Sequence, residues 1–203
     1  MSKPVSDLIS PVETHPWEPF IPDGARVLIM GTFPPGRHRW SMDFYYPNRT
    51  NDFWKMCGLL FSGDPAALLL PGSKDFDPDK IRRLLTEKKI ALHDTCHKIR
   101  RLRGNASDKY LEIVEPVDLR SLLDRMPLCS TIATTGEKAA GVVASLTATE
   151  PPAMGAWTQG DLTSDPRQLT IWRMPSTSRA YPLPLEKKAE YYALLFRSCG
   201  VLP

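Results

Sequence analysis

The chain has 203 residues, a formal net charge of +3 at pH 7 and 42% hydrophobic residues. This length allows one domain with a sizeable core, and the mild charge alone does not indicate a polyanion-binding protein. No apolar run reaches the roughly 18 residues of a membrane span, and the beginning of the chain lacks the apolar stretch of a signal peptide. We therefore expect a soluble, cytoplasmic protein.

The cysteines predict structural thiols rather than a metal site. They lie far apart, without a C-x-x-C pair or a histidine at ligand spacing, which favours buried thiols in a reducing compartment over an iron–sulfur or zinc centre. They are Cys57, Cys96, Cys129 and Cys199. We expect neither a metal nor a cofactor.

Residues 1–21 are rich in proline and polar residues and predict a segment that wraps over the surface of a single domain at 22–203, anchored by Trp17 and Phe20. Asn51 is expected to cap the first helix of that domain, and Asp77, followed by Pro78, the second. In chain order, the patterns predict a strand at 26–31, helices at 51–61 and 77–88, a strand at 89–94, a helix at 117–126, a strand at 130–135, a helix at 136–146, a strand at 168–174 and a helix at 185–196.

Short β-rich runs that alternate with helices are typical of a parallel sheet covered on both faces. Three segments lack clear periodicity, at 32–50, 98–117 and 175–184, and each follows the carboxyl end of a predicted strand, directly or after a few residues. In open parallel sheets, ligands bind outside those ends. We therefore expect the three segments to converge on one cleft.

The first of these segments offers backbone donors and aromatic rings. GTFPPG, which begins at Gly31, is too short for a phosphate-gripping loop and lacks its lysine, so it is consistent with a plain strand-exit turn. The amides of Thr32 and Phe33 have no predicted strand partner and can instead point at an anionic oxygen. Among Phe44, Tyr45 and Tyr46, one or two rings belong to the core, and stacking of the remaining ring on a base would contribute roughly 1–3 kcal/mol.

Two polar side chains, one at a helix start and one at a strand end, each have two interpretations. Asn51 either caps its helix, which stabilises by about 1 kcal/mol, or holds a water through its amide oxygen. Asp94 either caps the turn after its strand or faces the cleft, where its carboxylate accepts a hydrogen bond from a ring N–H.

The closing segment MPSTSRAYPLPLEKK carries hydroxyls and cations around the start of the last helix. It is consistent with an ordinary capped helix, but hydroxyls and helix-start amides also position phosphates. Arg37, Arg39 and the basic run at 98–103 would add to an electrostatic footprint, although such runs are more often a solvated face.

With these residues in view, the chain resembles the uracil-DNA glycosylase superfamily and is most similar to its hypoxanthine-DNA glycosylase branch. The resemblance covers residues 22–197 and rests on the order and spacing of GTFPPG, FYYPNRTNDFW, IALHD, TTGEKA and MPSTS with the following Leu-Glu-Lys-Lys. It implies a three-layer α/β/α domain with a central four-stranded parallel sheet. It also implies hydrolysis of the N-glycosidic bond of a flipped-out damaged base in DNA, that is, base excision repair.

The resemblance also implies roles for individual residues. Phe33 stands where most branches place a catalytic Asp or Asn, so that role passes to Asn51, which matches an Asn shortly before Phe-Trp in the hypoxanthine branch. Tyr46 matches a base-stacking aromatic, and Asp94 stands where the best-known branch has a uracil-reading Asn. Met174 replaces a His that stabilises the leaving base, which leaves this task to backbone amides and predicts a slow enzyme.

An aspartate offers uracil only acceptors, so hypoxanthine or xanthine becomes a plausible alternative substrate. The resemblance places a phosphate contact at Ser176 and a duplex wedge at 179–183. We expect base contacts from Thr32, Phe33, Phe44, Tyr46 and Asp94, and DNA contacts from Arg37, Arg39, Thr135, Lys138, Ser176, Thr177, Ser178, Arg179 and Tyr181.

The expected protein is a monomeric, monofunctional glycosylase whose partner is DNA with a damaged base, and no membrane. Two alternatives stay open: a non-catalytic module that binds damaged or single-stranded DNA, and a hydrolase of free nucleosides. The substitutions at Phe33 and Met174 favour the first alternative.

Overall fold

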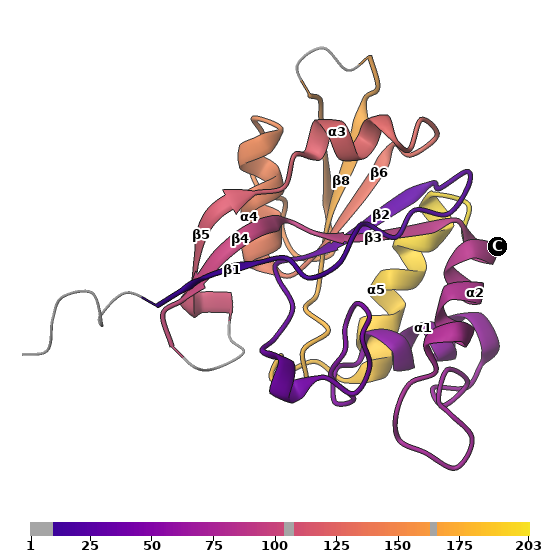
Figure 1. Ribbon diagram of the computed structural model, residues 1–203. Helices are drawn as coiled ribbons and strands as arrows, with labels where there is room; N and C mark the ends of the chain where they lie inside the picture. The colour runs from indigo at the N-terminus through magenta and orange to yellow at the C-terminus, as the bar shows by residue number, and fades with distance from the viewer. Residues whose placement is uncertain (1–9, 104–107, 163–165) are drawn as a thin grey trace, which may run out of the picture.

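A parallel β-sheet forms the centre of the computed structural model, which describes residues 10–103, 108–162 and 166–203. Its strand order is β3-β2-β6-β8-β7 (Figure 1). The four predicted strands are present and parallel, as β2 (Val27–Gly31), β3 (Ile90–Asp94), β6 (Thr131–Thr135) and β8 (Leu169–Met174). The edge strand β7 (Trp157–Gly160), which runs antiparallel to β8, was not predicted. Its alternately exposed and half-buried residues contain no apolar run.

Helices cover both faces of this sheet and make three layers (Figure 1). Val27 and Ile29 of β2 face α1 (Phe53–Ser62), α2 (Pro78–Lys88) and α5 (Leu185–Ser198). Leu28 and Met30 face the other side, which α3 (Leu119–Asp124) and α4 (Glu137–Leu146) cover. Burial of each such side chain stabilises the fold by about 1.5–3 kcal/mol. The α/β/α prediction with its four-stranded parallel core is confirmed.

A second, antiparallel sheet lies beside the first, with the order β1-β4-β5. It contains β1 (Val12–Thr14), β4 (Cys96–Arg101) and β5 (Leu111–Pro116). β4 and β5 occupy half of the segment 98–117, for which the sequence predicts no regular element, so that interpretation was wrong there. Most of these residues are half-buried or exposed, and cross-strand ion pairs such as Lys98–Glu115 and Arg100–Glu112 replace the apolar alternation of a typical strand.

The N-terminal segment lies against both sheets from residue 10 onward. β1 pairs with β4, and Phe20 forms an isolated antiparallel bridge with Leu92 of β3. The rings of Trp17 and Phe20 pack against the core. Residues 1–9 of the expected wrapping segment lie outside the described residues.

The sequence patterns predicted the positions of the helices and the burial of the cysteines correctly. Asp77 caps α2 by accepting hydrogen bonds from the amides of Asp79 and Lys80, next to Pro78 at the helix start. Three of the four free cysteines are buried, and Cys199 is partly buried. Among the described residues, two short 3-10 helices, η2 (Arg37–Arg39) and η3 (Asp108–Tyr110), complete the elements. In the described part of the chain, no helix combines the length and apolar character needed to cross a bilayer.

Candidate functional site

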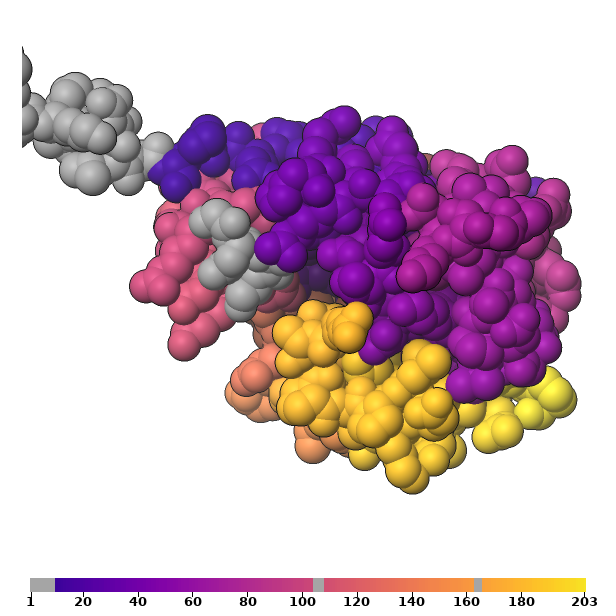
Figure 2. All heavy atoms as spheres, turned by 90° about the horizontal axis from the view of Figure 1, so that it is seen from below, coloured from indigo at the N-terminus to yellow at the C-terminus, as the bar shows by residue number. Residues whose placement is uncertain are grey.

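A cavity of about 1060 Å³ lies at the carboxyl ends of β2, β3, β6 and β8. Figure 2 looks onto this face, where the purple segment around residue 40 faces the golden closing segment around residue 180. The structure brings most of the predicted site residues together on the cavity wall. They are Thr32, Phe33, Arg39, Tyr46, Asn51, Asp94, Thr135, Lys138, Ser176, Thr177, Ser178, Arg179 and Tyr181.

Two predicted site residues lie elsewhere. Phe44 is 5% exposed and packs in the core against Phe20 and Trp54, with the Arg82 guanidinium 4.4 Å from its ring centroid. It therefore offers no ring face to a ligand in the cavity, contrary to the expectation. Arg37 does not line the cavity, because its guanidinium stacks on Trp40, 4.9 Å from that ring's centroid.

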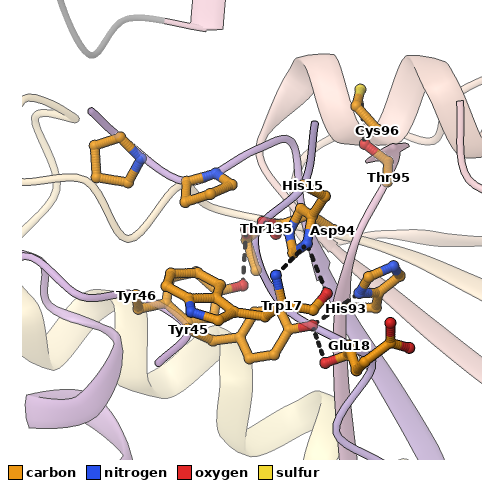
Figure 3. Close-up of polar contacts among 12 residues, drawn as sticks. His15, Trp17, Glu18, Tyr45, Tyr46, His93, Asp94, Thr95, Cys96 and Thr135 are labelled. Carbon is orange, nitrogen blue, oxygen red and sulfur yellow. Dashed lines mark hydrogen bonds and ion pairs between the residues drawn. The ribbon is translucent and has the colours of Figure 1, made fainter. Parts of the chain in front are cut away.

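Three polar side chains converge around Gly31 at the end of β2. A Cβ at this position would come within 2.6 Å of Asp94 Oδ1 and 3.6 Å of both Thr135 Oγ1 and Tyr46 OH. The two hydroxyls lie 3.3 Å apart (Figure 3). Asp94 is 6% exposed and lines the cavity. Glycine at residue 31 thus leaves room for a buried carboxylate and two hydroxyls to meet at one point of the cavity wall.

Tyr46 is held in an unusual conformation at this point. Its φ of 51° lies in the left-handed region, which costs free energy for a side chain of this size. Its ring stacks on Phe53 at a centroid distance of 4.0 Å, which covers one ring face. Burial, with the nearby Asp94 charge, raises the pKa of the phenol far above its ordinary value, so Tyr46 stays a neutral hydroxyl.

Asn51 lies on the cavity wall and also caps α1. Its Oδ1 accepts a hydrogen bond of 2.9 Å from the amide of Phe53, the first residue of the helix. The position before the helix is Asp52, so the prediction that Asn51 occupies it was wrong by one residue, although its side chain does cap the helix. A carbonyl oxygen has two lone pairs, so the cap leaves one available to a water. The two interpretations of Asn51 are compatible.

A buried ion pair joins the start of α1 to the closing segment. Lys188 Nζ of α5 lies 2.7 Å from Asp52 Oδ2 and donates to the backbone oxygen of Ser178 at 3.0 Å. The Asp52 amide donates to the Thr177 oxygen at 2.9 Å. The Lys188 side chain is 1% exposed. This Asp52–Lys188 clamp, which we did not predict, fixes Asn51 relative to 177–178.

Further charged groups stand around the cavity, and two of them, Asp108 and Lys109, were not predicted. Asp108 accepts a hydrogen bond of 2.7 Å from Thr32 Oγ1, and burial raises the pKa of its carboxyl. Lys138 donates to the backbone oxygen of Leu111, so part of its charge is used within the fold. The exposed cations on the wall are Arg39, Lys109 and Arg179.

Behind the cavity wall, His93 is a buried neutral histidine. Tyr45 OH donates to the Glu18 oxygen at 3.0 Å, so His93 Nδ1, at 2.8 Å from the same hydroxyl, donates to it (Figure 3). Burial, together with the nearby His15, lowers the pKa of His93 to about 4.

This pKa predicts an acid-sensitive fold. The unfolded chain binds a proton at His93 near pH 6.5, whereas the folded chain binds it only near pH 4. The stabilisation is therefore complete above pH 6.5 and is lost as the pH falls towards 4, by about 3 kcal/mol in total. Urea denaturation between pH 7 and pH 4 should show a shallower decline for His93→Gln than for the wild type. His38→Gln, on the exposed η2, is the control, and equal declines in all three proteins would contradict the prediction.

Comparison with known proteins supports the fold. No family model matches the chain, and no curated protein matches it. The chain is similar to the solution NMR structure of "a putative Uracil DNA glycosylase" from Methanosarcina acetivorans, with a TM-score of 0.61 and 20% sequence identity over 93% of this chain and 99% of that chain. At this identity the likeness establishes architecture. The chain therefore has a uracil-DNA glycosylase-like fold.

Proposed function

We propose that this protein is a DNA glycosylase that hydrolyses the N-glycosidic bond of a deaminated base. The observation that carries the proposal is the cavity itself, in which the Asp94 carboxylate, the Tyr46 ring and the Asn51 amide share one wall with the hydroxyl-rich closing segment. A carboxylate recognises a ring N–H, an aromatic ring packs against a base, and hydroxyls position phosphates. The similar structure from Methanosarcina acetivorans supports the same class of reaction.

In the proposed reaction, the target nucleotide leaves the duplex and its base enters the cavity. Asp94 accepts a hydrogen bond from the ring N–H of the base, and the Tyr46 ring packs against the edge or the open face of the base. The C1′–N bond then breaks, and its electron pair leaves with the base. The amides of Thr32 and Phe33 stabilise the negative charge that develops on a base oxygen.

Asn51 positions the water that attacks C1′. The water oxygen forms the new bond to the sugar, and the water's proton ends on the released base, which balances the hydrolysis. An amide is a weak base, so Asn51 aims the water without deprotonating it before attack. The sugar cation that forms as the base departs is reactive enough for a neutral water. Met174 stands in place of a leaving-group histidine, and we therefore expect slow turnover.

The mouth of the cavity suits a nucleic-acid backbone. Ser176 and Ser178 lie on the closing segment, and the exposed Arg39, Lys109 and Arg179 stand around it. Phosphate contacts of this kind make binding weaken as salt rises. We assign the closing segment to phosphate positioning.

The test is a base-excision panel. Fluorescent oligonucleotides that carry uracil, hypoxanthine or xanthine, single- and double-stranded, are incubated with excess enzyme and then cleaved with alkali. We expect strand cleavage for at least one base and none for the unmodified sequence. The absence of product from every oligonucleotide would overturn the proposal. In that case, salt-sensitive binding without base release would support the alternative of a non-catalytic DNA-binding module, which the residue Phe33 favours. Cleavage of free nucleosides would instead support a nucleoside hydrolase.

A further inference from the structure

Asp94 presents its two oxygens to different surroundings. Oδ2 lies 3.0 Å from His15 Nε2, whereas Oδ1 is the oxygen that faces Gly31, near the hydroxyls of Tyr46 and Thr135 (Figure 3). A carboxylate only accepts hydrogen bonds, so His15 Nε2 is the donor in the first contact. The His15 bond therefore occupies one oxygen and leaves the other directed at the cavity wall.

His15 is built into the fold with little freedom to move. Its side chain is 1% exposed, and its backbone amide donates to the His97 oxygen at 2.8 Å, at the junction of β1 and β4. Its Nδ1 lies next to the Trp17 backbone, 3.3 Å from the amide nitrogen that donates to it and 2.9 Å from the carbonyl oxygen, which sets the rotation of the ring. Tyr45 stacks on the ring at a centroid distance of 5.9 Å, and Phe33 packs edge-on at 5.5 Å. Four contacts thus aim one N–H at one oxygen.

We infer that His15 is a positioning residue that sets the base specificity of the site: it fixes the Asp94 carboxylate so that Oδ1 accepts a ring N–H of the bound base. The inference rests on the proposed function and adds the N-terminal segment to the recognition machinery. The chemical class selected is a base with an N–H in its ring beside a carbonyl group. A base whose ring nitrogen is methylated leaves Asp94 buried without its partner, and sites of this type reject such analogues strongly.

The experiment compares two bases of the panel, uracil and hypoxanthine, with their N-methylated forms, 3-methyluracil and 1-methylhypoxanthine, in otherwise identical duplexes. The readout is the ratio of the single-turnover rates of base release for the two forms. The amide of His15→Asn is too short to reach Asp94, so this variant loses one hydrogen bond to a charged group. We expect the rate of release of the N–H base to fall about 10- to 100-fold, and the rate ratio between the N–H and N-methyl forms to become smaller. His15→Gln, whose longer side-chain amide can still donate to Asp94, should recover most of the rate and most of the rate ratio. His97→Ala, a neighbouring histidine on β4, should match the wild type.

An unchanged ratio in a folded His15→Asn variant would overturn the inference, as would equal losses in His15→Gln and His15→Asn. Equilibrium binding of the same duplexes, followed by fluorescence anisotropy, separates this inference from the proposed function. A wild-type protein that releases no base but prefers the N–H duplex, and loses that preference in His15→Asn, supports the role of His15 while the glycosylase proposal fails. Equal binding of the N–H and N-methyl duplexes by the wild type overturns the inference.

Discussion

Lys188→Met is expected to lower the free energy of unfolding by about 3 kcal/mol, the lower end of the usual effect of removing one partner from a buried ion pair, because the Asp52 side chain is itself 18% exposed. The methionine fills most of the volume of the lysine stem, so the loss comes from the Asp52 carboxylate, whose partner at 2.7 Å is gone. The Ser178 oxygen loses its 3.0 Å hydrogen bond in the same change. Chemical denaturation at pH 7 gives the measurement.

The chain supplies a matched control in the adjacent residue. Lys187 pairs with Glu190 at 2.9 Å, but the two side chains are 59% and 62% exposed. Exposed pairs of this kind contribute little to stability, because water screens both charges, so Lys187→Met should change stability little. The double variant Asp52→Leu with Lys188→Met removes the stranded charge and should be more stable than Lys188→Met alone. Equal losses for Lys187→Met and Lys188→Met would show that burial does not strengthen the clamp.

The parallel core was predictable because each of its strands is a short apolar run, bounded by turns and buried on both faces. β2 and β3 are buried along their whole length, and the apolar runs with which they begin are typical of that environment. β4 and β5 pair with each other and bury only a few side chains, Cys96, Ile99 and Leu111, against α4, with charged residues between them. Their residues show no periodicity that distinguishes them from a loop. Their structure depends on their pairing with each other and on the pairing of β4 with β1, which is distant in sequence.

The same distinction applies to the site. Asp94, Asn51 and the closing segment follow strand ends or precede helices, so their convergence followed from the topology of a parallel sheet. Nothing in the sequence distinguishes which of the three successive aromatic rings faces the cavity. Phe44 takes a core position, whereas Tyr46, whose backbone is left-handed, is only partly buried and lies on the cavity wall.

One missed residue did leave a signal. Lys188 falls on the buried face of α5, in step with Leu185, Tyr192 and Leu195 at helical spacing. A lysine on an apolar face implies a buried partner, although not which one. His15 left none, since it lies in a proline-rich stretch without periodicity, and its partner Asp94 is 79 residues away.

Asn51→Ala is expected to reduce base release about 100-fold or more, the effect of removing one group that acts directly on the reacting atoms. The same change also removes the 2.9 Å cap on the Phe53 amide, which destabilises α1 by about 1 kcal/mol. Activity and stability therefore have to be measured on the same variants, by single-turnover base release and by denaturation.

Asp77→Ala separates the two effects, because it removes a cap of the same kind from α2, away from the cavity. It should lower stability by about 1 kcal/mol and leave base release unchanged. Asn51→Asp keeps an acceptor for the Phe53 amide but loses the amide donors and adds a negative charge to a wall that already holds Asp94 and Asp108. Its stability should stay near that of the wild type while its activity falls. If Asn51→Ala and Asp77→Ala instead retained the same activity, Asn51 would be a helix cap alone, and the water would have to be held by another group on that wall.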